Sequence, residues 1–172
     1  MNINKLTFDI SEIEHVCPFY CLTNSTGIIL KTGTSLKKIL HEKTTEQIKG
    51  HISDWLEYAG EECDAQDWRL ENIEAMQHRP FRVKCKNADI ELACEAIEVS
   101  TKKWMVIKEK YWIVLMRPLL RNSEDLEKWG LTLQDFSLID PARTELVNML
   151  MEESLRNELI RAVKMEEFNT EE

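Results

Sequence analysis

Residues 111–118 read YWIVLMRP, and the first six of these residues form the longest uninterrupted apolar run in the chain. Such a run has the length of a β-strand and is far short of the roughly 20 apolar residues that a membrane-spanning helix needs. Strands without polar alternation are typical of a sheet interior, where both faces are covered. Pro118 has no amide hydrogen for a further ladder bond and so predicts the end of the strand. We therefore expect residues 111–116 to be the central strand, and we expect no membrane partner.

Four further strands are predicted around this one. Residues 19–23 and 28–32 are strand-like and flank the turn sequence NSTG, which predicts a hairpin. Residues 81–85 alternate apolar and basic side chains, as a half-buried strand does. Residues 90–99 are also strand-like, and 104–107 either continue that strand or form a separate piece. The pattern predicts an α+β fold with a five-stranded antiparallel sheet and helices on one face.

Helices are predicted between the strands and after them. Residues 36–40 suggest a short helix, and from 53 to 73 apolar residues recur at spacings of three and four, which predicts a longer amphipathic helix. Residues 123–130 begin with serine and end with glycine, as a short capped helix does. The Asp-Pro pair at 140–141 opens the final helix, because Asp is a preferred N-cap and Pro a preferred first residue.

The composition is that of a globular chain. Its 172 residues carry a net charge of −9, with 43% hydrophobic and 31% charged residues, which argues against disorder. Residues 54–74 alone hold eight carboxylates and one arginine. Excess acid repels phosphate, so we expect no nucleic-acid partner. The N-terminus lacks the apolar segment of a secretory signal and the five cysteines follow no disulfide spacing, which predicts a reduced, cytoplasmic protein.

No arrangement of residues predicts catalysis, and metal binding is disfavoured. The chain has no Ser/His/Asp order, no P-loop and no Gly-x-Gly-x-x-Gly segment. His15, Cys17 and Cys21 lie close together in sequence but lack zinc-site spacing. Most of the five tryptophans are expected to fill the core, the alternative being a ligand pocket lined by Trp55, Trp104 or Trp112. We expect no enzyme and no cofactor.

The final helix carries two offset apolar stripes. The first has coiled-coil spacing but is interrupted by Glu153 and Arg156, and the second begins at Leu155. A strict coiled coil keeps one stripe for three or four heptads, so an imperfect coiled coil with a register shift fits better. The alternative, packing of the helix on its own domain, applies best to 142–150. The residues expected at a helix interface are Leu146, Met149, Leu155, Leu159, Ile160 and Val163.

Two stretches of the chain resemble one protein family. The first comprises CPFY at 17–20, then Gly27 and GTSL at 33–36. The second is more specific, with WIVLMRP at 112–118 followed by DL at 125–126, GL at 130–131, LQDF at 133–136 and DPAR at 140–143. This order is similar to the end of the haem-NO-binding-associated domain (HNOBA, also called H-NOXA). Tyr20 and Ile139 stand where that family often has histidine.

The resemblance implies a PAS-like fold and a regulatory function. Domains of this family link a haem NO/O₂ sensor domain to a cyclase or histidine kinase output, dimerise, and pass the signal into a following helix, while the haem belongs to the sensor domain. The resemblance also implies a leader at 1–16, the PAS-like domain at 17–141 and a connector helix at 142–172. We expect a homodimer, or a heterodimer with a paralogue. The alternative is a PAS sensor that itself binds haem, flavin or a small metabolite.

The motif positions supply the residues to which we assign structural or signalling roles. Asp140 is expected to cap the exit helix, and Arg143, in its first turn, to reach back to the sheet or to Asp135. The full set is Pro18, Phe19, Gly33, Pro118, Asp125, Gly130, Asp135, Asp140 and Arg143.

Overall fold

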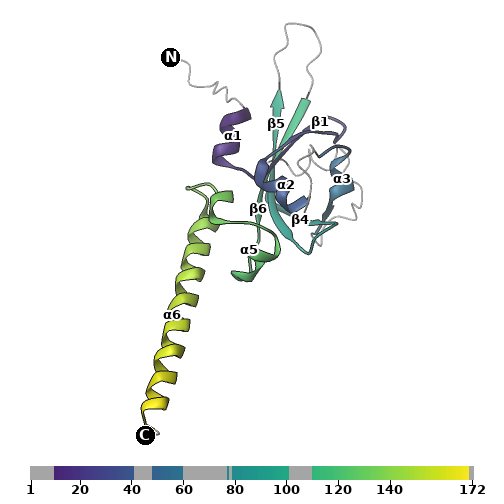
Figure 1. The fold of residues 1–172 in the computed structure, drawn as a ribbon. Helices are drawn as coiled ribbons and strands as arrows, with labels where there is room; N and C mark the ends of the chain where they lie inside the picture. Colours follow the sequence, from purple (N-terminus) through teal and green to yellow (C-terminus); the bar gives the residue numbers. More distant parts are fainter. Residues whose placement is uncertain (1–9, 41–47, 60–76, 78, 101–109, 171–172) are drawn as a thin grey trace, which may run out of the picture.

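The computed structural model describes residues 10–40, 48–59, 77, 79–100 and 110–170. Its helices and strands follow one another as shown in Figure 1. In chain order they are α1 (Ile10–Val16), β1 (Tyr20–Asn24), β2 (Ile29–Thr32), α2 (Thr34–Leu40), α3 (Ile52–Trp55), β3 (Leu56–Tyr58), β4 (Phe81–Cys85), β5 (Glu91–Ser100), β6 (Lys110–Pro118), α5 (Glu124–Lys128), the 3₁₀ helix η1 (Leu133–Asp135) and α6 (Pro141–Thr170).

The strands form one sheet in the order β2-β1-β6-β5-β4-β3, and each neighbouring pair is antiparallel. β6 lies inside this order and pairs with β5 along its whole length and with β1 over residues 111–115. The prediction that the run at 111–116 is central is therefore confirmed, as is the α+β class with an antiparallel sheet. Trp112, in the middle of this strand, is fully buried.

The prediction of five strands is wrong, because the sheet has a sixth strand inside the segment expected to be helical. The helix that begins at Ile52 ends at Trp55, and Leu56 adopts extended backbone angles. Leu56 then pairs with Cys85 of β4. Local apolar spacing carries no information about this distant pairing, which here overrides the helical pattern. Residues 60–73 of the predicted helix and residues 104–107 of the predicted strand lie outside the described residues.

The hairpin between β1 and β2 forms where the NSTG turn predicts it. The side-chain Oδ1 of Asn24 accepts hydrogen bonds from the backbone N–H groups of Thr26 (3.0 Å) and Ile28 (2.9 Å). Gly27 has a φ of +80°, and a Cβ there would lie 2.4 Å from the ring of His51. Glycine is thus required both by the backbone angle and by the close approach of a second segment.

The core contains strand residues together with residues of the helices. Cys21, Val83 and Trp112 belong to one buried cluster with Leu36 of α2 and Ile52 of α3. The helices thereby cover the apolar side chains that the sheet presents, as an α+β arrangement requires.

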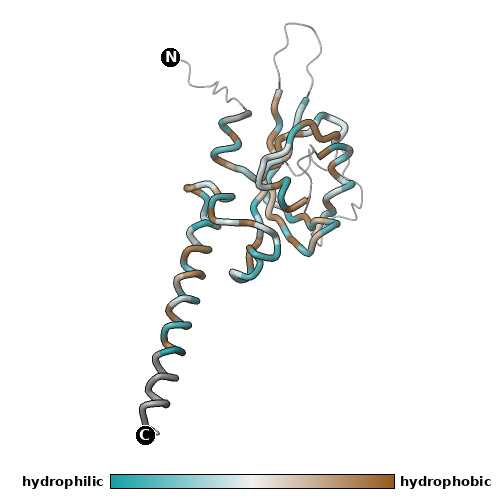
Figure 2. Tube along the Cα trace, in the orientation of Figure 1, coloured by the Kyte–Doolittle hydropathy of each residue, from teal (hydrophilic) through white to brown (hydrophobic). Residues whose placement is uncertain are grey.

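α6 is partly joined to this core and partly free of it. Ala142 and Leu146 are buried in the same cluster, whereas every residue from Met151 to Arg161 is exposed. Figure 1 shows the helix running away from the sheet, and Figure 2 shows apolar and polar positions mixed along it. In the part of the chain that the structure describes, each helix is too short or too polar to span a membrane.

Candidate functional site

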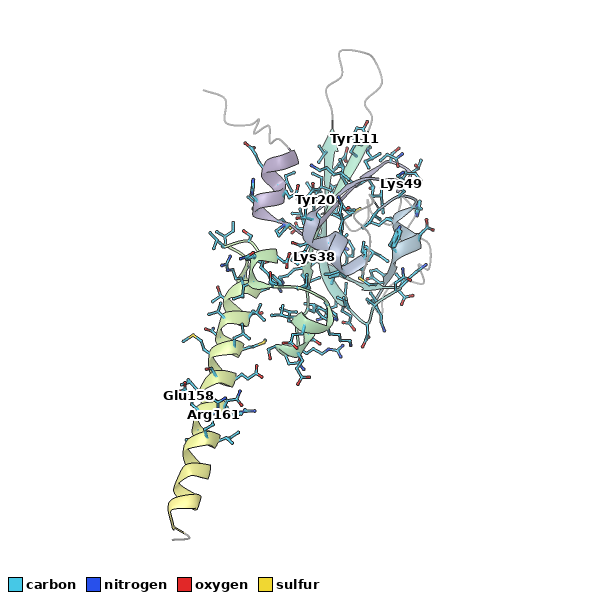
Figure 3. The ribbon with its side chains drawn as sticks, viewed as in Figure 1. Tyr20, Lys38, Lys49, Tyr111, Glu158 and Arg161 are labelled. Atoms are coloured by element: carbon cyan, nitrogen blue, oxygen red, sulfur yellow. The ribbon has the colours of Figure 1, made fainter. Side chains whose placement is uncertain are left out.

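A buried carboxylate joins two segments that are far apart in the sequence. Asp135, at the end of η1, is 7% exposed, and its Oδ1 lies 2.6 Å from the Nζ of Lys38 in α2. Its Oδ2 accepts hydrogen bonds from the backbone N–H (2.8 Å) and the hydroxyl (3.0 Å) of Thr132. The hydroxyl of Ser35 donates to the backbone carbonyl of Asp135 at 2.8 Å. We call Ser35, Lys38, Thr132 and Asp135 the Asp135 clasp; Figure 3 shows Lys38 on the α2 side of it.

The clasp keeps the Asp135 carboxylate charged. Burial alone would raise the pKa of this carboxyl, but the hydrogen bonds from Lys38 and Thr132 outweigh that effect and hold the pKa below its ordinary value. Both carboxylate oxygens accept hydrogen bonds, so the buried charge is not left unpaired. An ionised Asp135 therefore fixes α2 to the segment that leads into α6.

Immediately after the clasp, two residues define the root of α6. Oδ1 of Asp140 accepts a hydrogen bond from the N–H of Ala142 at 2.9 Å, as expected of an N-cap before Pro141. Nη1 of Arg143 donates to the backbone carbonyl of Phe136 at 3.4 Å. The Arg143 side chain thus reaches the residue next to Asp135, rather than Asp135 itself. The cap and this bond set the direction in which α6 leaves.

The start of β1 contacts the same region. The rings of Phe19 and Phe136 lie 5.3 Å apart between centroids and are tilted by 53°. The N–H of Gly33 donates to the carbonyl of Tyr20, and a Cβ at Gly33 would lie 1.9 Å from the carbonyl oxygen of Pro18. Only glycine allows these two backbones to approach so closely. These contacts hold the start of β1 against the end of β2 and against Phe136, the residue next to Asp135.

The remaining motif residues shape the connection from β6 to the clasp. Pro118 is the last residue of β6, opposite Leu92. Oδ2 of Asp125 accepts from the N–H of Arg121 at 2.9 Å, and Gly130 follows α5 with a φ of +62°. These are turn-forming roles, and no contact recorded in the described structure joins Asp125 or Gly130 directly to the clasp.

The structure separates the residues expected at a helix interface. Leu146 is fully buried in its own domain, and Met149 is half-buried beside a hollow of about 80 Å³ between α6 and the end of β6. In contrast, Leu155, Leu159 and Ile160 are exposed by 64%, 66% and 47%. The side chain of Val163 lies outside the described residues.

Sequence reasoning missed half of the clasp. Lys38 is separated from Asp135 by 97 residues, and a lone lysine on a short helix carries no signal of such a partner. Thr132 does carry a sequence signal of its partner, because Thr-x-x-Asp matches the spacing of a capping box. The structure has that box at η1. Ser35 belongs to the matched GTSL segment and is a candidate N-cap from the sequence, but its bond to the carbonyl of Asp135 was not predicted.

The core holds polar atoms that lack hydrogen-bond partners in the described structure. Three of these five atoms are Oγ1 of Thr23, Oγ1 of Thr32 and Nε1 of Trp112. Thr23 lies directly opposite Trp112 in the β1–β6 ladder, and Thr32 lies opposite Cys21 in the β1–β2 ladder. The three side chains therefore point to the same, core-facing side of the sheet. Buried polar groups are usually paired, so this cluster stands out.

The described cysteines are free thiols. Burial raises the pKa values of Cys21 and Cys85 to about 12, and it raises the pKa of Cys94 well above the ordinary value of a thiol. Burial is also the main cause of the raised pKa of Cys17. Thiols that stay protonated are poor nucleophiles and poor metal ligands. Among the described residues, no three His, Cys, Asp or Glu side chains lie close enough together to hold a metal ion.

The tryptophans and histidines can be placed in part. Trp55 donates its Nε1–H to the carbonyl of Lys49 at 3.1 Å, and His51 accepts from the N–H of Ser53 as the N-cap of α3. Trp104 and the histidines at 41 and 78 lie outside the described residues.

Compared with known proteins, the chain matches no family model and no curated sequence.

Proposed function

We propose that this chain is a regulatory module of the HNOBA type, with a PAS-like fold, that couples a haem NO/O₂ sensor domain to a cyclase or histidine kinase output. In this proposal it dimerises, acts in the cytoplasm and performs no catalysis of its own. The observation that carries the proposal is the Asp135 clasp, which ties the sheet-bound helix α2 to the root of α6, a helix that is exposed from Met151 to Arg161. The resemblance of residues 112–146 to the end of that family supplies the identity of the input and the output.

The mechanism starts at the root of α6, where Ala142 and Leu146 are buried and the hydroxyl of Ser123 donates a hydrogen bond to Glu153. Movement of α2 over the sheet pulls on Asp135 through Lys38 and Ser35. The displacement passes along residues 136–140, where Phe136 contacts Phe19 and Arg143, and changes the angle at which α6 leaves. A rigid helix converts a small rotation at its root into a large displacement at its far end. Such two-state motion of a packed element is a common way to transmit a signal.

The test is crosslinking in cells that express the protein from its natural locus. Cysteines introduced at Leu155 and Leu159 are treated with a bismaleimide before and after addition of an NO donor, with the unsubstituted protein as control. The proposal expects the crosslink pattern to change on NO addition, and expects Asp135→Asn to abolish that change. An identical pattern in both states would contradict signal transmission through α6.

A second function is favoured by the unpartnered polar atoms of Thr23, Thr32 and Trp112. We propose as the alternative that the chain is a PAS sensor whose core binds a small polar ligand or a cofactor such as haem or flavin, which would supply the missing hydrogen bonds. Native mass spectrometry and a visible absorption spectrum of the purified protein test this directly. A bound mass that is present on the wild-type protein and absent from Trp112→Phe supports this alternative. A colourless protein whose mass equals that of the polypeptide alone rejects it.

A further inference from the structure

A small hollow lies between the first turns of α6 and the end of β6. Its volume is about 80 Å³, and residues 117–120 form one wall. The other wall is formed by Ala142, Glu145, Leu146 and Met149, which share one face of α6 because helical residues three and four positions apart are neighbours. The hollow therefore borders the root of α6, where the direction of the helix is set. We call it the α6-root hollow.

The buried part of the lining is apolar. Pro118, Ala142 and Leu146 are buried, and Met149 beside them is half-buried. A cavity of about 150 Å³ lined by apolar side chains holds benzene, so a hollow of roughly half that volume accepts three or four carbon atoms. This size suits a short branched aliphatic group, such as the side chain of valine or leucine.

Two charged side chains of opposite sign line the same hollow. They are Arg117, half-buried in β6, and Glu145, exposed on α6. Within the part of the chain that the structure describes, neither side chain has an ion pair or a hydrogen bond, and none joins the two. Their charged atoms are therefore further apart than a direct contact, which leaves room for ligand groups between them. A guanidinium without a protein acceptor offers its N–H donors to a carboxylate.

We propose that the α6-root hollow binds a free α-amino acid with a short aliphatic side chain, such as leucine or valine. Arg117 binds the carboxylate of the ligand, Glu145 binds its ammonium group, and the aliphatic side chain fills the apolar part beside Leu146 and Met149. This inference goes beyond the proposed function, because it assigns a ligand site that lies outside the core and requires no sensor domain.

The charges of the lining distinguish this class of ligand from others. An organic anion without an ammonium group would place its carboxylate near Glu145, and a simple amine would place its ammonium group near Arg117; in each case like charges repel. Arg117 also repels a metal cation. A nucleotide is too large for about 80 Å³ and would bring phosphate charge to Glu145. Of these classes, the zwitterion with an apolar group alone pairs both charges and fills the apolar part.

A bound amino acid connects two elements of the fold. Its carboxylate is held by the end of β6 and its ammonium group by α6, so the ligand clamps the root of the helix to the sheet. A ligand that binds one orientation of a helix more tightly than another shifts the population toward that orientation. The concentration of the amino acid therefore biases the direction in which α6 leaves.

The experiment follows the methyl group of Met149 by NMR in the whole chain, with isotope-labelled methionine methyl groups, during titration with L-leucine. We expect the Met149 signal to shift with a dissociation constant of roughly 1 mM, as suits a small ligand in a partly open site. Met151 is 60% exposed and lies on the opposite side of the helix, so its signal should stay in place. A Met149→Leu sample identifies the signal.

Two analogues of leucine test the two charges of the ligand. Isocaproate lacks the ammonium group, and isopentylamine lacks the carboxylate. Each analogue keeps the aliphatic group but loses one charge-assisted hydrogen-bonded pair, so each should bind about tenfold more weakly than leucine.

Two variants test the two charges of the protein. Arg117→Gln should weaken leucine binding about tenfold without weakening isopentylamine, and Glu145→Gln should weaken leucine binding to a similar extent without weakening isocaproate. Arg161→Gln and Glu158→Gln make the same changes outside the hollow and should leave leucine binding unchanged. Figure 3 shows both control positions on the half of α6 that lies away from the sheet.

Three results would each overturn the proposal. The first is a Met149 signal that stays in place up to the solubility limit of leucine, which would mean that the hollow holds water only. The second is equal binding of leucine and both analogues, and the third is equal binding of leucine to the wild type and to both hollow variants. The titration contains no NO donor and no partner domain, so its outcome is independent of the NO-dependent crosslinks that test signal coupling.

Discussion

Removing the Asp135 carboxylate tests the clasp most directly. Asp135→Ala deletes the ion pair with Lys38 and both hydrogen bonds from Thr132, at a residue that is 7% exposed. A hydrogen bond to a charged group contributes about 1.5–3 kcal/mol when it is shielded from water, and a neutral one about 1 kcal/mol. Lys38 is half-exposed, so its bond is taken at the lower end of that range. We expect Asp135→Ala to lower the free energy of unfolding by about 3 kcal/mol.

The measurement is urea unfolding followed by tryptophan fluorescence. Lys38→Met removes only the ion pair and keeps the bonds from Thr132. Because water can reach the position that the Lys38 ammonium leaves, this variant should lower the free energy of unfolding by about 1 kcal/mol. An Asp135→Ala protein that unfolds within about 0.5 kcal/mol of the wild type would refute the assignment of a structural role to the clasp.

The same carboxylate makes a specific prediction for pH. Because the pKa of Asp135 is lower in the folded protein than in the unfolded chain, its charge stabilises the fold above the unfolded pKa of about 3.9, and that contribution is lost as the pH falls through the lower, folded value. Asp135→Asn lacks this contribution, so its stability should decline less than that of the wild type across the acidic interval. Parallel curves for the two proteins would show that Asp135 titrates normally.

Four further substitutions separate the roles of the fold and of α6. Gly33→Ala puts a Cβ 1.9 Å from the Pro18 carbonyl oxygen, so thermal unfolding should show a loss of at least about 2 kcal/mol; an unchanged melting temperature would show that the backbones separate easily. Asp140→Ala removes the cap of α6 and should cost about 1 kcal/mol, with faster proteolysis within α6 than in the sheet; equal rates in both would contradict a local effect. Leu146→Ala should cost about 3 kcal/mol in urea unfolding, and Leu155→Ala less than about 0.5 kcal/mol at dilutions that favour the monomer; similar losses would mean that α6 packs differently.

Local sequence signals predict the elements whose cause is local. The apolar run at 111–116, the NSTG turn and the Asp-Pro start of α6 each act through their own residues, and each forms as predicted. β3 escapes prediction because its three residues become a strand only by pairing with β4. Helical spacing near it was therefore misleading.

In the candidate site, too, local sequence signals predict some residues and only the folded structure brings in the others. Asp140 stands out through its own capping pattern and Asp135 through the matched motif, but Lys38 becomes a partner only after the chain has folded. Leu146 and Leu155 are the same residue type on the same helix, yet one is buried and the other is exposed. Helical periodicity gives their relative orientation, and only the position of the sheet decides which of them meets the core.

The order of strands also bears on how the chain folds during its synthesis. β6 is the last strand to be made, yet it separates β1 from β5 and pairs with both, with Tyr20 opposite Leu115. At ordinary rates of translation, β1 waits roughly 5–20 s for its partner to be added. Throughout this time the N-terminal hairpin exposes an unpaired edge, which is a template for aggregation. A chain whose synthesis stops before residue 110 therefore lacks the central strand of its sheet, and such a chain is expected to need chaperones.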